Sequence, residues 1–137
     1  MESANADYLA DMATRFSDMK ARYPYQFVTA PSPFQYDVPA GWVLVFEQLC
    51  TDVDALLQGK PHAFHWARLK DKLGGPRWIP CFTHGLEAHD AERLQELRFR
   101  AEKQASELCV VCGSTPVHRN HPSDAPVCAS HADSMAG

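Results

Sequence analysis

Apolar residues recur at helical spacing in three segments of the chain, which predicts three helices. In the first segment, residues 5–22, the apolar positions lie one, three or four residues apart: Tyr8, Leu9, Met12, Phe16 and Met19. The third segment, residues 90–108, repeats the spacing with smaller side chains: Leu94, Leu97, Ala101, Ala105 and Leu108. Both stripes are narrow, so each of these helices is expected to cover a core with one face only.

The second segment, residues 42–58, has the broadest apolar face in the chain. Its members are Trp42, Val45, Phe46, Leu49, Cys50, Val53, Leu56 and Leu57. These residues form one broad apolar face at helical spacing. We therefore expect residues 42–58 to form the central core helix.

Between the second and third helices the apolar period changes from that of a helix to that of a strand. Phe64, Trp66 and Arg68 alternate with the residues between them, and an extended pattern resumes at Arg77 after Gly74-Gly75. Two alternating runs around a glycine pair predict a β-hairpin that turns near Gly74-Gly75. Residues 34–38 also alternate, which predicts a short edge strand.

The order of these elements predicts an α+β fold in two parts. Residues 1–108 are expected to form an α+β body with an N-terminal helix, a core helix, a hairpin and a third helix. Residues 109–137 contain few large apolar side chains and cannot build a core alone. We expect this segment to need another source of stability and to pack on the body.

The spacing of cysteines and a histidine in this segment indicates that a bound metal supplies the missing stability. The ligand pattern C-x2-C-x15-C-x2-H consists of Cys109, Cys112, Cys128 and His131. Two close pairs of sulfur and nitrogen ligands suit tetrahedral zinc, and four protein ligands leave no position for water or substrate. Gly113, directly after the second cysteine, suits the tight turn of a zinc knuckle. We predict one structural Zn²⁺ in a module resembling a treble clef or a zinc ribbon.

A second metal site is an alternative with weaker support. Cys81, His84, His118 and His121 also form two pairs at ligand-like spacing, and an enzyme could use a metal held there. The competing interpretation is that the histidines are solvated loop residues and that Cys81 is partly buried. Cys50 lies on the apolar face of the core helix, where we expect a buried structural cysteine and not a nucleophile.

Charge is distributed unevenly along a chain of 137 residues whose net charge is -4. Residues 60–78 carry five cations and only one acid, Asp71, and aromatic residues stand between the cations. Such a segment can bind nucleic acid by stacking bases and following phosphates. On that interpretation the binding residues are Lys60, Arg68, Lys70, Lys72, Arg77, Trp66 and Trp78. We favour the other interpretation, in which the aromatics face the core and the cations extend into water.

Composition excludes several classes of protein. An apolar fraction of 45% with 22% charged residues is typical of a folded globular chain. No stretch of about 18 apolar residues exists, so we expect no membrane partner. The N-terminus lacks the basic and apolar regions of a secretory signal, so the expected location is cytoplasmic. A phosphate-binding glycine loop, a nucleophile elbow and a helical H-E-x-x-H are all missing, which favours a protein that is not an enzyme.

Three motifs in residues 41–131 occur in a specific order. Gly41-Trp42 and Leu49-Cys50 come first, then K-x-K-x-G-G-x-R-W over residues 70–78, then a helix leading into C-x2-C-G and a late C-x2-H. This order resembles a group of small phage and prophage proteins. The departure is Pro76, where the group usually has an aliphatic residue.

The resemblance implies a phage origin and no particular chemistry. Small acidic phage proteins are often inhibitors or adaptors of host machinery, including CRISPR defence complexes. We therefore expect a non-enzymatic, zinc-stabilised protein that acts on a host protein or protein complex in the bacterial cytosol. The alternative is a nucleic-acid-binding accessory protein that uses the basic hairpin, residues 60–78, and the zinc module.

Overall fold

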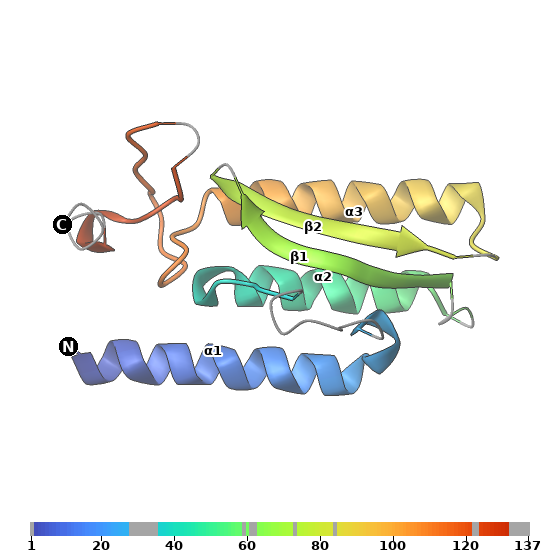
Figure 1. The fold of residues 1–137 in the computed structure, drawn as a ribbon, viewed down its shortest axis with the longest axis horizontal. Coiled ribbons are helices and arrows are strands. Elements are labelled where there is room, and N and C mark those ends of the chain that lie inside the picture. The colour runs from blue at the N-terminus through green and yellow to red at the C-terminus, as the bar shows by residue number, and fades with distance from the viewer. Residues whose placement is uncertain are drawn as a thin grey trace.

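The computed structural model describes residues 2–27, 36–58, 60, 63–72, 74–83, 85–121 and 124–131, except for the side chains of residues 2–5 and Lys72. The predicted α+β class is confirmed. Three α-helices and one antiparallel hairpin make up the body of the described chain, with a loop-rich segment at its C-terminal side (Figure 1). The elements are α1 (Glu2–Arg22), α2 (Val43–Leu56), β1 (Phe64–Lys72), β2 (Gly75–Phe82) and α3 (Ala88–Ser106), and short 3-10 helices cover Pro24–Phe27 and Ala40–Trp42.

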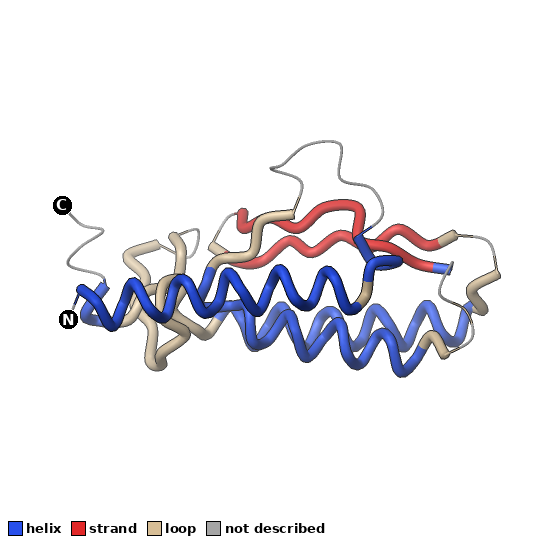
Figure 2. The backbone as a smooth tube through the Cα atoms, turned by 90° about the horizontal axis from the view of Figure 1, so that it is seen from below, coloured by secondary structure: helices blue, strands red, loops and turns tan. Residues whose placement is uncertain are grey.

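Helix α2 occupies the centre of the fold, as its broad apolar face predicts. It contacts α1 on one side and α3 on another, while α3 also contacts β2. The two strands lie on one side of the molecule, and α2 and α3 lie on the other (Figure 2). In the described part of the chain, no helix combines the length and the apolar character that a membrane crossing requires.

The hairpin turns where the sequence predicts, but its residues do not alternate regularly between the two faces. Lys72 pairs with Gly75 at the turn, and Gly74 has a positive φ of 84°, which glycine adopts without strain. The pairing shifts by one residue between Trp66 and Arg68. This β-bulge places both Trp66 and Leu69 on the buried side, and it turns Arg68 outward. The sequence pattern had placed Arg68 on the same face as Trp66, and that prediction is wrong.

The predicted edge strand at residues 34–38 is reduced to a single bridge in the described residues. Tyr36 forms an isolated parallel bridge with Leu69, and the Asp37 backbone N–H donates to the Leu69 carbonyl at 2.8 Å. The Tyr36 hydroxyl also donates to the Trp66 carbonyl at 2.7 Å. Residues 34 and 35 lie outside the described residues. These contacts satisfy carbonyl groups on the outer edge of β1.

Aromatic side chains fill the space between the hairpin and α2. The Phe46 ring lies 5.4 Å from the Trp66 ring and 5.0 Å from the Trp78 ring, and Trp42 packs edge-on against Trp78. Trp66 and Trp78 are both fully buried. The favoured interpretation, in which these rings face the core, is therefore confirmed, and the alternative role of Trp66 and Trp78 as contacts for nucleic acid or a partner is wrong.

Gln26 is a fully buried polar residue that links three elements. Its side-chain amide donates to the Cys50 carbonyl at 3.1 Å and to the Tyr25 hydroxyl at 3.2 Å. Its amide oxygen accepts the Trp66 indole N–H at 3.1 Å. The Gln26 amide, the Cys50 carbonyl and the Trp66 indole N–H thus all have hydrogen-bond partners, which offsets the free energy cost of removing these polar groups from water.

Replacing Gln26 tests this network. We expect Gln26→Leu to lower the free energy of unfolding by about 1–3 kcal/mol, because the Trp66 N–H and the Cys50 carbonyl lose their partner inside the core. Urea denaturation followed by tryptophan fluorescence measures the change. Gln48→Leu, on the exposed side of α2, is the matched control and should change stability by less than about 0.5 kcal/mol. Equal stability of the two variants would contradict the network.

Candidate metal centre

Four residues near the C-terminal side of the described chain bring their ligand atoms together. The sulfurs of Cys109, Cys112 and Cys128 and a ring nitrogen of His131 all lie within 4.8 Å of one another. His131 Nδ1 is 3.2 Å from Cys128 Sγ and 3.5 Å from Cys109 Sγ, and the sulfurs of Cys112 and Cys128 are 3.7 Å apart. All the cysteines are free thiols. This group is the one predicted from the spacing, and its geometry is compatible with a metal site.

The first ligand pair lies on a tight turn that directs N–H groups at a sulfur. Gly113 has a φ of 76°, and its N–H donates to the Cys109 carbonyl at 2.8 Å. Burial by itself raises the pKa of Cys109. Backbone N–H groups of Cys128, Cys112 and Val111, together with the His131 ring, outweigh burial and lower the pKa of Cys109 to about 6. The turn is thus arranged to hold a thiolate.

The second ligand pair lies at the start of a short helical turn. The His131 N–H donates to the Cys128 carbonyl at 3.0 Å, and residues 129–131 are helical. The pKa of Cys128 is raised, first by burial and then by its contacts with the sulfurs of Cys112 and Cys109, although the His131 backbone N–H acts in the opposite direction. Mutual repulsion of thiolates in one small volume favours binding of a cation there.

The first turn is fixed to the start of the central helix by backbone contacts. The Gly41 N–H donates to the Val110 carbonyl at 2.9 Å, and the Trp42 indole N–H donates to the Leu108 carbonyl at 3.1 Å. A Cβ atom on Gly41 would lie 1.8 Å from the Cys109 carbonyl oxygen. Only glycine allows the two backbones to approach this closely, so Gly41 determines how the metal centre sits on the body.

Arg119 joins the C-terminal segment to two further elements. Its guanidinium donates to the carbonyl of Gly74 in the hairpin turn, to that of Ser106 at the end of α3 and to that of Asp124 in its own loop. The last carbonyls of a helix carry the negative end of its dipole, which favours a cation at Ser106. Sequence reasoning missed Arg119, because no spacing or motif marks an arginine that binds backbone carbonyls.

Helix α1 also reaches the metal centre. The Tyr8 hydroxyl donates to the Ala40 carbonyl at 3.3 Å, beside Gly41. The pKa of Tyr8 is raised, first by burial and then by the nearby sulfurs of Cys112 and Cys109. Tyr8 was predicted only as part of an apolar stripe, and its polar end in fact faces the ligand turn.

The alternative second metal site does not assemble among the described residues. Cys81, His118 and His121 do not gather with one another there, and His84 lies outside the described residues. Cys81 is paired in the hairpin with His65, and the backbone of His118 bridges to Val127. Cys50 is fully buried, as predicted, and burial raises its pKa, so it is held as a thiol.

The basic residues of segment 60–78 lie in two different surroundings. Lys60 lies near the start of α3, with its Nζ 3.5 Å from Glu87 and 3.9 Å from Asp90. Arg68, Lys70 and Arg77 are exposed on the outer side of the hairpin. The backbone of Lys72 continues β1, while its side chain is not among those described.

Comparison with known proteins adds no relative. No protein-family model, curated protein or solved structure matches this chain.

The lowered pKa of Cys109 gives a pH dependence for metal binding. An acid whose pKa falls on folding contributes stability above its ordinary pKa and loses that contribution as the pH drops through its folded value, here about 6. We expect the metal affinity of this centre to fall as the pH drops, with protonation of Cys109 adding to the loss below about 6, because protons compete with the metal for the thiolates. A colorimetric chelator measures the release, and full retention near pH 4 would contradict thiolate ligation.

Proposed function

We propose that this chain is a non-enzymatic binding protein that is stabilised by one structural Zn²⁺ and that acts as an inhibitor or adaptor of a host protein complex in the bacterial cytosol. The observation that carries the proposal is the saturated ligand set of Cys109, Cys112, Cys128 and His131. Four protein ligands leave a tetrahedral metal no open position for a substrate or for an activated water. Such a metal folds a segment and does not catalyse.

Zinc fits the ligand atoms by both size and chemistry. With Zn–S bonds of about 2.3 Å and Zn–N bonds of about 2.05 Å, a tetrahedron has edges of about 3.8 Å between sulfurs and about 3.6 Å between sulfur and nitrogen. Three of the six separations, 3.7, 3.5 and 3.2 Å, are close to these edges, and all six lie within 4.8 Å. Three thiolates and one imidazole are also a donor set that favours zinc over hard cations such as Mg²⁺.

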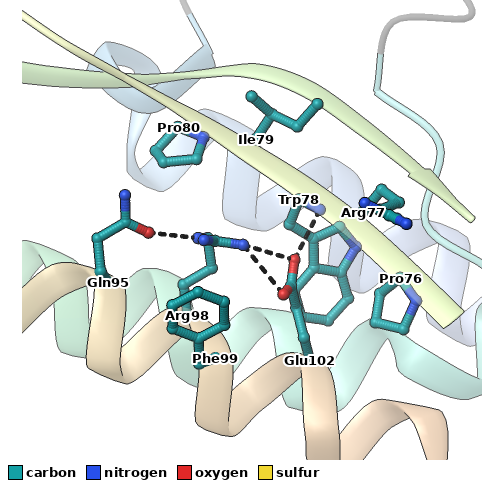
Figure 3. A pocket seen from close by; sticks show the side chains of 9 residues that line it. All are labelled: Pro76, Arg77, Trp78, Ile79, Pro80, Gln95, Arg98, Phe99 and Glu102. Carbon is teal, nitrogen blue, oxygen red and sulfur yellow. Dashed lines mark hydrogen bonds and ion pairs between the residues drawn. The ribbon is translucent and has the colours of Figure 1, made fainter.

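A groove between β2 and α3 is the best candidate for the protein-binding surface. Its volume is about 510 Å³, and Figure 3 shows strand residues facing helix residues across it. Phe99 is 60% exposed and lines both this groove and a neighbouring hollow beside Phe82. The Arg98 guanidinium lies 4.3 Å from the centre of the Phe99 ring and makes a cation–π contact with it. An exposed aromatic side chain beside a groove belongs to a residue class that is enriched at protein interfaces.

The edge of β2 in this groove is closed to an added strand. Backbone N–H groups along a strand point alternately toward and away from the neighbouring strand, and the backbone nitrogens of residues 76, 78 and 80 face away from β1. Two of these residues, Pro76 and Pro80, have no N–H to donate. The third N–H, that of Trp78, donates to Glu102 at 2.9 Å, and Arg98 binds the same carboxylate at 3.0 Å (Figure 3). A partner therefore has to insert side chains here and cannot extend the sheet.

Residues of the motifs that carry the phage resemblance lie at structurally important positions in the fold. Gly41 contacts the ligand turn, Gly74 forms the hairpin turn that Arg119 binds, and Trp78 lies in the core. Residues of the motifs that carry the resemblance therefore have structural roles in this chain. The inhibitor role follows from that resemblance by analogy.

The structural zinc is tested by removing one ligand. We expect the wild-type chain to hold one zinc and Cys112→Ser to hold none at micromolar zinc, because losing one thiolate of a structural site weakens binding by orders of magnitude. The variant should also lose protease resistance in residues 109–131 while keeping most of its helical circular dichroism. Cys81→Ser, outside the ligand group, is the matched control and should keep its zinc. Zinc retention in Cys112→Ser would contradict the proposed site.

The binding surface is tested by capture from host lysate after nuclease treatment, with quantitative mass spectrometry. We expect Phe99→Ser to reduce recovery of the wild-type partner by about ten-fold or more, since truncating a central interface residue commonly costs about 2 kcal/mol or more. Leu44→Ser is the matched control, because Leu44 is 49% exposed on α2 and away from the groove. Equal recovery by Phe99→Ser and wild type would refute this surface, and recovery that disappears with nuclease would refute a protein partner.

A further inference from the structure

The outer face of the hairpin gathers cations that have no described counter-charge. Arg68, Lys70 and Arg77 are all exposed, and none forms an ion pair with a described residue. Lys70 and Arg77 are direct cross-strand partners, and Arg68 is the partner of Ile79 on the same face. The β-bulge is what adds Arg68 to this set, since without the shift it would point into the core.

A like-charged pair in direct register is unfavourable for the isolated hairpin. Lys70 and Arg77 repel each other, and like charges opposite one another in an antiparallel pair destabilise it. Elsewhere on the described surface the chain does place acids beside cations, as Glu87 and Asp90 lie beside Lys60. A bound polyanion would remove the repulsion on the outer face.

The shape and the buried aromatics of this face limit the kind of polyanion. Proteins that bind single strands stack bases on exposed aromatic rings. Trp66 and Trp78 are fully buried and cannot do so. A two-stranded ribbon fits the major groove of B-form DNA, whereas the major groove of A-form RNA is too narrow for side chains to read. The strands lie on the side of the molecule opposite α2 and α3 (Figure 2), and the side chains of Arg68, Lys70 and Arg77 are exposed there.

We propose that the outer face of the hairpin, with Arg68, Lys70 and Arg77 as its phosphate contacts, binds double-stranded B-form DNA. This surface excludes Lys60, which is engaged at the start of α3, and it excludes both tryptophans. The proposal is independent of the protein partner proposed above. It can fail while that partner is confirmed, because DNA binding is measured with the purified chain alone.

The test is fluorescence anisotropy of a labelled duplex of about 20 base pairs with the zinc-loaded full chain, at roughly 50 to 200 mM salt. Three phosphate contacts predict a slope of log K against log salt of about -2.7. We expect Lys70→Glu/Arg77→Glu to weaken binding by about ten-fold or more at low salt and to reduce the slope by about 1.8. Arg100→Glu/Lys103→Glu makes the same charge change at exposed positions of α3 and should weaken binding much less.

A single substitution separates loss of binding from loss of folding. Lys70→Glu places an acid opposite Arg77, so we expect a higher Tm together with weaker DNA binding. Unchanged DNA binding in the double variant, or an equal loss in the α3 control, would overturn the proposal. Tighter binding to single-stranded DNA, or equal binding to duplex RNA, would overturn the assignment of B-form DNA.

Discussion

The close approach of Gly41 to the ligand turn is the contact on which the arrangement of the two parts depends. A Cβ at this position would overlap the Cys109 carbonyl oxygen, so the backbones touch without side chains between them. The N–H of Gly41 then binds the Val110 carbonyl, one residue along from a ligand. Because Gly41 immediately precedes Trp42 and α2, the position of the metal centre and the start of the core helix are set together.

This contact gives the metal more than a local role. The segment after residue 108 has few large apolar side chains, and its described hydrogen bonds to the body include ones to the start of α2, the hairpin turn and the end of α3. Each of these bonds contributes on the order of 1 kcal/mol, and they require the loop to be ordered first. A metal that closes the ligand turn supplies that order, so its binding free energy becomes folding free energy for the contacts that follow.

The parts of the fold that were predictable from sequence are those governed by local periodicity and ligand spacing. The three helices follow from apolar spacing, and the structure places their ends within three residues of the predicted positions. The ligand group follows from C-x2-C and C-x2-H because short spacings constrain local geometry. The face of Arg68 was not predictable, because a bulge is decided by packing: Trp66 and Leu69 both have to reach the core. Gln26 and Arg119 were missed for a related reason, since their partners are backbone or buried groups distant in sequence.

The same bulge explains how one hairpin serves both the core and a charged surface. Before the shift, Phe64 and Trp66 point inward, and after it Leu69 does, so the buried side loses no apolar contact. The outer side gains Arg68 beside Lys70, across from Ile79 and Arg77. Burial of the aromatics stabilises the ribbon strongly enough to tolerate the repulsion between Lys70 and Arg77, since two fully buried tryptophans contribute several kcal/mol and an exposed like-charged pair costs about 1 kcal/mol or less. The core therefore permits a concentration of positive charge that the strands alone would not hold.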